Sequence, residues 1–251
     1  MIHFVGAGPG AVDLITVRGR EMLSEADVII YAGSLVNPEL LNHAQSQCEL
    51  HDSSKMTLEQ VIDVIQAAEA RSKNTVRLHT GDPSLFGAVR EQFDELERLG
   101  IPYDVCPGVS ALSGAAAALK AEYTLPEVSQ SVIITRMEGR TPVPEKEKLR
   151  LLAAHGASMA LFLSAGLIEG VQRELMEGGY APDTPSAIVY KASWPDERIY
   201  RCPLSQLSQT AQANDVKKTA LIVVGNFLGD TYARSKLYDP TFTTGFREGK
   251  P

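Results

Sequence analysis

The feature that most constrains this chain is a short apolar strand that runs directly into a glycine-rich turn. Ile2, Phe4 and Val5 form the apolar run, and Gly6-Ala7-Gly8-Pro9-Gly10 follows it. This order predicts a buried first strand that enters a tight loop. Because glycine has no Cβ and tolerates positive φ, and because Pro9 stiffens the turn, the backbone here can approach a ligand closely.

The turn matches the dinucleotide fingerprint G-x-G-x-x-G/A, which is the first interpretation to weigh. That fingerprint requires a helix directly after the loop and an acidic residue at the end of the second strand. Residues 12–15 instead predict an extended apolar segment, and Thr16 is the first plausible helix N-cap. The second predicted strand, residues 28–31, ends in Ala-Gly-Ser without a carboxylate. The sequence therefore disfavours a nicotinamide cofactor.

Composition excludes several classes of protein. The 251 residues suffice for one large domain or two ordinary ones, and 44% hydrophobic with 22% charged residues is typical of a soluble globular protein. We expect a cytoplasmic protein, because no membrane-spanning run or secretory signal pattern is present. A net charge of −7 without a basic block disfavours nucleic acid. Cys48, Cys106 and Cys202 are too scattered to suggest a zinc site or a disulfide framework, and no metal is expected.

Two further predicted strands end in turns of the same kind. The strand at residues 75–79 runs into Thr80-Gly81-Asp82-Pro83-Ser84, and the strand at 103–106 runs into Pro107-Gly108-Val109-Ser110. Helices are expected between the strands, at residues 58–70, 89–99 and 111–121. This alternation predicts an α/β domain with a largely parallel sheet. Ligands of such sheets bind outside the carboxyl ends of the strands, so we expect the three turns to converge on one cleft.

A second series of elements begins after the apolar pattern lapses near Leu125-Pro126. The expected domains are an N-terminal α/β domain at residues 1–123, a C-terminal α/β domain at 130–231 and a loosely ordered tail at 232–251. Two α/β domains that face one cleft would result. The expected strands of the second domain are residues 131–135, 159–164, 186–190 and 220–225, and its expected helices are 149–155 and 168–178.

Taken together, the turns resemble the signatures of the tetrapyrrole methylases, which use S-adenosylmethionine on porphyrin and corrin precursors. Residues 5–19 are similar to the first signature, and residues 78–87 with 107–111 are similar to the second. Thr75 stands where the second signature usually has a leading Val. The similarity covers residues 1 to 230. It implies a homodimer of two-domain α/β subunits, a cofactor cleft between the domains and a small-molecule tetrapyrrole substrate.

The resemblance also implies which residues contact S-adenosylmethionine. Most are small, which suits recognition by main-chain groups, and Gly81→Val is expected to abolish cofactor binding by filling the space that the backbone occupies. No residue is expected to act as a covalent nucleophile, because methyl transfer from a sulfonium depends on positioning. The implied contacts are Pro9, Gly81, Asp82, Leu85, Phe86, Ser110, Ala111, Phe162, Leu163, Ser164, Ala192, Thr219, Ala220 and Leu221.

Three segments, residues 32–36, 135–145 and 189–197, resemble the branch of the family that methylates C11 of precorrin-4 or its cobalt form. That substrate carries many carboxylates, which an acidic protein must meet with local positive charge. Asp82 is expected to order its own turn by accepting backbone N–H groups, whereas the role of Asp13 stays open. The candidate substrate contacts are Gly8, Asp13, Arg18, Arg136, Arg140 and Lys191.

Two alternatives remain open from the sequence. One is another methylase of the same family, acting at C17, at C20 or on uroporphyrinogen III; the segment at residues 138–142 favours C11 over these. The other is a nucleotide-binding regulatory module without turnover.

Overall fold

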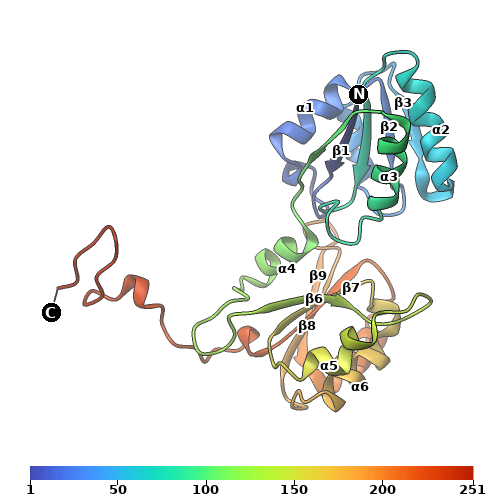
Figure 1. The fold of residues 1–251 in the computed structure, drawn as a ribbon. Helices are drawn as coiled ribbons and strands as arrows, with labels where there is room; N and C mark the ends of the chain where they lie inside the picture. Colours follow the sequence, from blue (N-terminus) through green and yellow to red (C-terminus); the bar gives the residue numbers. More distant parts are fainter. Residues whose placement is uncertain (251) are drawn as a thin grey trace. The chain divides into compact units, whose positions relative to one another are not determined.

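The computed structural model describes residues 1–250, which form two compact units (Figure 1). The first unit contains Met1–Ala115 and Lys191–Glu197, and the second contains Ala116–Tyr190 and the chain from residue 198 onward. The division lies inside helix α4 (Ala111–Leu119), earlier in the chain than the expected linker between residues 123 and 130. Because α4 is one unbroken alanine-rich helix, no change of composition marks this division in the sequence.

Within the described residues, the first unit is built on a five-stranded parallel sheet, which confirms the expected parallel arrangement. Strand β3 has no counterpart in the prediction, because it is an edge strand whose Glu49 and Leu50 are exposed, so it lacks a buried apolar pattern. The other four strands have the predicted bounds. The order across the sheet is β3 (Glu49–Asp52), β2 (Val28–Tyr31), β4 (Thr75–His79), β1 (Ile2–Gly6) and β5 (Tyr103–Cys106).

Helices cover both faces of this sheet (Figure 1). Helix α1 (Val17–Glu25) packs Leu23 against one face, while α2 (Leu58–Glu69) and α3 (Arg90–Leu99) pack against the other. The chain leaving β1 therefore turns to one face, and the chain leaving the adjacent β4 turns to the opposite face. Such a switch point leaves a crevice at the carboxyl ends of the two strands.

The predicted helix ends are confirmed by their capping contacts. Thr16 Oγ1 accepts the N–H of Gly19 at 3.0 Å at the start of α1, and Thr57 forms a capping box with Gln60 at the start of α2. Gly100, with φ +66°, ends α3. The segment before α1 was expected to be extended, which is wrong, because residues 12–14 form a 3-10 turn closed by the Ile15 N–H.

The second unit has a mixed sheet, in which β6 and β7 pair in parallel and the other neighbours pair antiparallel. The prediction lacks β9, an edge strand in which Arg198, Ile199 and Arg201 are exposed, and the short helix α7. Across the sheet the order is β6 (Val132–Arg136), β7 (Ser158–Phe162), β10 (Ala220–Val224), β8 (Pro185–Tyr190) and β9 (Arg198–Pro203).

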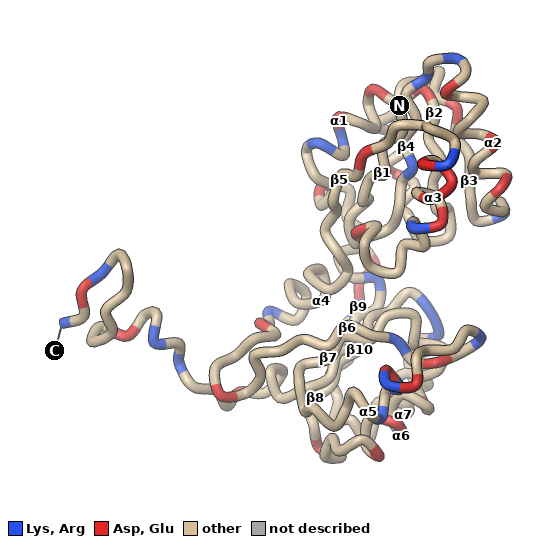
Figure 2. The backbone as a smooth tube through the Cα atoms, in the orientation of Figure 1, with Lys and Arg blue, Asp and Glu red and all other residues tan. Residues whose placement is uncertain are grey.

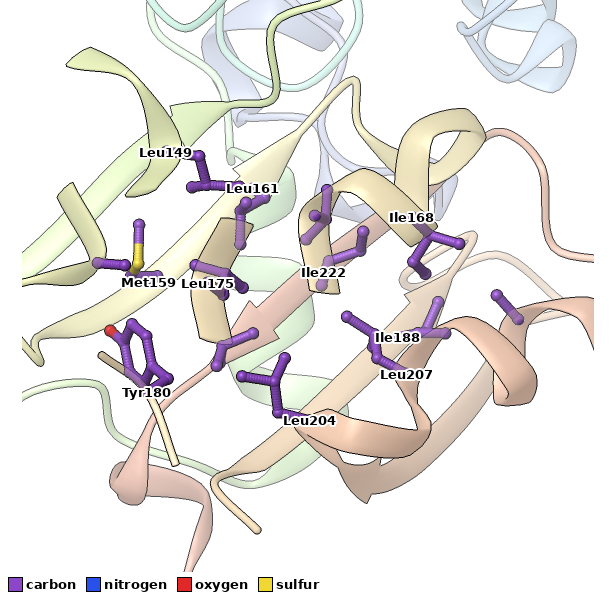
Figure 3. Close-up of a cluster of buried hydrophobic side chains, with 14 of the residues drawn as sticks. Leu149, Met159, Leu161, Ile168, Leu175, Tyr180, Ile188, Leu204, Leu207 and Ile222 are labelled. Atoms are coloured by element: carbon purple, nitrogen blue, oxygen red, sulfur yellow. The ribbon is translucent and has the colours of Figure 1, made fainter. Parts of the chain in front are cut away.

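Three helices cover one face of this sheet, α5 (Leu149–Ala153), α6 (Ile168–Glu177) and α7 (Leu207–Ala213). Figure 3 shows the core between them, where strand residues such as Met159 and Ile222 lie against Leu175 and Leu207 of the helices. These side chains are completely buried. Burial of the apolar face of each helix against the sheet therefore stabilises the second unit.

Charged residues lie mainly on helices and loops, with both signs interspersed (Figure 2). None of the helices in residues 1–250 has the length and apolar character needed to cross a membrane. Beyond residue 231 the chain contains a 3-10 turn, Lys236–Tyr238, and the side chains of Tyr238 and Phe246 are exposed.

Candidate functional site

The three glycine turns of the first unit meet at the carboxyl edge of its sheet. Gly8 and Gly81 form an isolated bridge, in which the Gly81 N–H donates to Gly8 O at 2.8 Å and the Gly8 N–H donates to Gly81 O at 3.2 Å. The third turn joins them, because the Gly108 N–H donates to Asp82 Oδ2 at 2.8 Å. The expected convergence of the turns is confirmed.

The turns contact one another through backbone, which explains the glycines. A Cβ on Gly6 would lie 2.5 Å from Gly108 Cα, and a Cβ on Gly108 would lie 2.1 Å from Gly81 O. Gly81 differs, because a Cβ there would make only an ordinary 3.7 Å contact with Ala111 N. Its φ of +61° is instead what excludes larger residues. The effect of a larger side chain at Gly81 on cofactor binding stays a prediction, and the positive φ gives a second, conformational reason for glycine at this position.

Asp82 orders the second turn, as expected. Its Oδ1 accepts the Ser84 N–H at 2.9 Å, and its Oδ2 accepts the Gly108 N–H. Burial raises the pKa of the Asp82 carboxyl, but the hydrogen bonds from Ser84 and Gly108 outweigh it and leave the pKa below its usual value. The carboxylate therefore stays ionised and ties two turns together.

Residues 191–197, called here the clamp segment, pack on the first turn. The Trp194 ring lies so close to Gly10 that a Cβ there would be 2.0 Å from Trp194 Cδ1. Trp194 Nε1 donates to Pro9 O at 3.1 Å, and Ser193 Oγ accepts the Ala11 N–H at 3.0 Å. The sequence analysis assigned no role to Trp194. An available signal was that Trp194 is the only tryptophan and lies in a segment that resembles the C11 branch.

Helix α4 brings two predicted cofactor contacts together. A Cβ on Gly114 would lie 3.0 Å from Pro9 Cβ and 3.4 Å from Ala192 Cβ. Ser110 and Ala111 begin this helix, and Ser110 Oγ accepts the Leu112 N–H at 3.2 Å. The sequence separates these residues widely, but the first unit gathers them beside the glycine turns.

Removing the Trp194 indole N–H should loosen the first turn. Trp194→Phe keeps a ring over Gly10 but loses the hydrogen bond to Pro9 O, so we expect the free energy of unfolding to fall by about 1 kcal/mol. Chemical denaturation measures this change. Tyr232→Phe, at an exposed residue of the tail, is the control and should leave stability unchanged. Equal stability of the two variants would contradict the assigned contact.

The candidate substrate contacts of the first unit have different surroundings. A pocket of about 580 Å³ lies beside the first turn, and Asp13 lines it together with Arg20, Glu39 and His43. Arg18 is exposed on α1. The Lys191 ammonium binds Asp196 Oδ2 at 2.7 Å and lies 5.3 Å from the centroid of the Trp194 ring, so the clamp segment itself holds this charge.

The predicted cofactor contacts of the second unit lie together where β7 ends and β10 begins. Arg136 pairs with Phe162 across β6 and β7, and Ala220 pairs with Tyr190 across β10 and β8. Since β10 also runs antiparallel to β7, its first residues lie next to the end of β7. The structure therefore brings residues 162–164 and 219–221 together.

Ser164 joins the ends of β6 and β7. Its hydroxyl is fully buried, donates to Phe162 O at 2.6 Å and accepts the Met137 N–H at 2.8 Å. Arg136 donates to the carbonyls of Met137, Thr141 and Pro142, at 3.3, 3.2 and 2.7 Å. The guanidinium of Arg136 therefore shapes the loop that carries the exposed Arg140.

Backbone strain marks several predicted contacts. Phe86, Leu163, Lys191 and Thr219 all have positive φ, at 57°, 52°, 47° and 54°. Non-glycine residues adopt this conformation rarely, and such strain is concentrated at ligand-binding sites. Phe86 and Leu163 also expose 44% and 67% of their surface, although both are apolar.

Two α/β units, one with glycine turns joined through their backbones, define a two-domain α/β methyltransferase of class III. The profile of the Tetrapyrrole (Corrin/Porphyrin) Methylases matches residues 1–208, and the chain belongs to this family.

Relatives and solved structures agree over nearly the full length. The chain is 54% identical to a cobalt-precorrin-4 C(11)-methyltransferase of Methanocaldococcus jannaschii, covering 98% of this chain and 96% of the relative. It is 42% identical to a precorrin-4 C(11)-methyltransferase of a Sinorhizobium species, covering 98% of each.

Among solved structures, the X-ray structure of a cobalt precorrin-4 methyltransferase superposes with a TM-score of 0.89 at 43% identity, covering 91% of this chain and 96% of that one. A uroporphyrin-III C-methyltransferase from Thermus thermophilus, complexed with S-adenosyl homocysteine, gives 0.77 at 26% identity, with coverage of 90% and 98%.

The residues present fit S-adenosylmethionine. Around Gly81 a methyl-sized space faces Ser110 and Ala111, so main chain is accessible to a ligand there. The exposed apolar side chain of Phe86, in the second glycine turn, suits contact with the face of an adenine ring.

Proposed function

We propose that this protein transfers a methyl group from S-adenosylmethionine to C11 of precorrin-4 or cobalt-precorrin-4 in cobalamin biosynthesis, giving precorrin-5 or its cobalt form. The convergence of the glycine turns through the Gly8–Gly81 bridge and the Asp82–Gly108 hydrogen bond is the observation that carries this proposal. The two C(11)-methyltransferases that match nearly the whole chain at 42–54% identity favour C11 over other ring positions.

S-adenosylmethionine supplies a methyl group that is already activated on a sulfonium. The protein then has to hold the acceptor carbon in line with that methyl, an effect that can contribute roughly 7–11 kcal/mol. The rigid bridge of Gly8 and Gly81 and the ionised Asp82 suit this task, because they fix the turns before ligands bind. No covalent nucleophile is needed.

The cofactor contacts are proposed in two groups, each within one unit. Those of the first unit are Pro9, Gly81, Asp82, Leu85, Phe86, Ser110, Ala111 and Ala192, around the three turns. Those of the second unit are Phe162, Leu163, Ser164, Thr219, Ala220 and Leu221, at the shared edge of β7 and β10.

Substrate carboxylates are proposed to meet Arg18 and Arg140, both exposed, while Gly8 and Asp13 lie at the first turn and its pocket. Arg136 and Lys191 are engaged by their own loops, through backbone carbonyls and Asp196 respectively. Arg136 and Lys191 would therefore contribute to substrate binding indirectly, by fixing the conformation of those loops.

Arg140→Ala should weaken binding of the tetrapyrrole and spare the cofactor. Loss of one charge-assisted contact to a carboxylate is expected to raise KM about tenfold. Steady-state kinetics at varied tetrapyrrole measure this, and calorimetry with S-adenosylhomocysteine should give wild-type affinity. Arg98→Ala, which removes a surface charge on α3, is the control. A wild-type KM for Arg140→Ala would remove Arg140 from the substrate contacts.

Incubation with methyl-labelled S-adenosylmethionine tests the function directly. Label at C11, located by NMR, is expected in precorrin-5 when the substrate is precorrin-4 and in cobalt-precorrin-5 when it is cobalt-precorrin-4. Comparing the two substrates shows which one is preferred. Methylation at another ring carbon would favour a different methylase of the family. Cofactor binding without any transfer would favour a regulatory module.

We also propose that the protein works in the cytoplasm as a homodimer. The homodimer follows from the family resemblance and the cytoplasmic location from the sequence pattern, and the acidic composition accords with a partner that is a small molecule rather than nucleic acid. Sedimentation equilibrium tests the assembly, and the mass of a single 27.2 kDa chain at micromolar concentration would contradict it.

A further inference from the structure

The face of β4 that packs against α2 and α3 is polar, although it is buried. Thr75, Arg77 and His79 alternate along this face and expose only 0%, 7% and 4% of their surface. A buried guanidinium is costly unless its donors are used. Burial lowers the pKa of Arg77 to about 10, so the group remains charged at neutral pH.

Arg77 uses its donors on neutral acceptors. Its Nε donates to Gln92 Oε1 at 3.0 Å, and its Nη1 donates to Ile30 O at 3.2 Å. These contacts fix the side-chain amide of Gln92, which is itself 6% exposed, with its oxygen toward Arg77 and its nitrogen toward the opposite side.

The nitrogen of that amide reaches the loop of the second signature. Gln92 Nε2 donates to Ala88 O at 2.9 Å, in the last turn before α3. Ala88 has φ +48° and Phe86 has φ +57°, so the backbone at this point is strained. Strained residues persist only where the surroundings hold them. The loop held in this way contains Leu85 and Phe86, which are proposed cofactor contacts.

We propose that Arg77 and Gln92 are positioning residues, which hold the strained end of loop 80–88 in the conformation that binds the cofactor. The chain of contacts runs from the sheet, at Ile30, through Arg77 and Gln92 to Ala88. Both side chains are buried, with 7% and 6% of their surface exposed. This inference rests on the proposed function only in naming the cofactor, because the support of the loop exists without a ligand.

The variant Gln92→Glu tests the contact to the loop without removing the contact to Arg77. A carboxylate at this position still accepts from Arg77, but it cannot donate to Ala88 O and repels that carbonyl. Because the carboxylate gains a charge-assisted contact with Arg77 that offsets the lost donor, the thermal midpoint should stay close to wild type. In the cofactor-free protein, amide hydrogen exchange of residues 84–89 should accelerate about tenfold, because the loop loses its tie. Affinity for S-adenosylhomocysteine, measured by calorimetry, should fall about fivefold to tenfold.

Glu91→Gln is the matched control, since Glu91 is the exposed neighbour on the same turn of α3. It should leave both exchange and affinity at wild-type values. A second variant, Arg77→Met with Gln92→Leu, replaces both partners by apolar groups, which preserves burial without the tie to Ala88. It should reproduce the faster exchange and the lower affinity.

Wild-type exchange of residues 84–89 in both variants would overturn the proposal. So would a failure of both variants to fold, which would assign the pair to the stability of the sheet. If the wild-type protein does not bind S-adenosylhomocysteine, the proposed function fails, whereas the exchange experiment still decides the role of Gln92.

Discussion

Gly108→Ala is expected to abolish cofactor binding and to destabilise the protein strongly. The added Cβ would lie 2.1 Å from Gly81 O and 2.7 Å from Gly6 Cα, and both contacts are with backbone that cannot turn away. Overpacking of this kind costs about 3 kcal/mol of the free energy of unfolding. For a chain of this size that corresponds to a drop of roughly 6–12 °C in Tm.

Calorimetric titration with S-adenosylhomocysteine and a thermal scan measure the two effects. Gly245→Ala is the control, because a Cβ there meets nothing within 4 Å, and it should match wild type in both. Wild-type affinity and Tm in Gly108→Ala would show that the three turns do not meet through their backbones.

Stability is expected to fall steeply in mild acid because His79 is buried in its neutral form. Burial, together with the neighbouring Arg77, lowers the pKa of His79 from 6.5 to about 3. Its ring stacks on Phe4 with centroids 5.9 Å apart, and Nε2 has no hydrogen-bond partner among the described residues. Between these pKa values the unfolded chain takes up a proton that the native protein does not.

The stability due to a neutral His79 is therefore fully present above pH 6.5 and is lost as the pH falls toward 3. From pH 7 to pH 4 the loss is about 3 kcal/mol of the free energy of unfolding. Urea unfolding across this range measures it. His79→Phe keeps the stack on Phe4 without a titrating group, so its curve should be flatter than that of wild type by this amount.

His155→Gln, at an exposed histidine, should keep the wild-type pH dependence. Parallel curves for wild type and His79→Phe would mean that His79 is protonated in the native protein, contrary to its burial.

Local sequence determined most of the elements. The strands from Ile2, Val28, Thr75 and Tyr103 have predicted bounds because each is a short segment with apolar residues in sequence or in alternation, ended by turn residues. The caps Thr16, Thr57 and Gly100 were predictable because capping is a contact with residues only a few positions away. Strands β3 and β9 were not, since edge strands are exposed and need no apolar pattern.

The sequence by itself also determined that three glycine turns follow parallel strands, because turn chemistry and strand pattern are local. Only the tertiary structure decided why each position requires glycine. At Gly6 and Gly108 a Cβ would collide with neighbouring backbone, whereas Gly81 adopts a positive φ. The tertiary structure also decided that Trp194 covers Gly10 and that Gln92 supports Ala88. Such contacts depend on where the folded backbone places each segment, and a periodic pattern along the chain does not predict which segments come into contact.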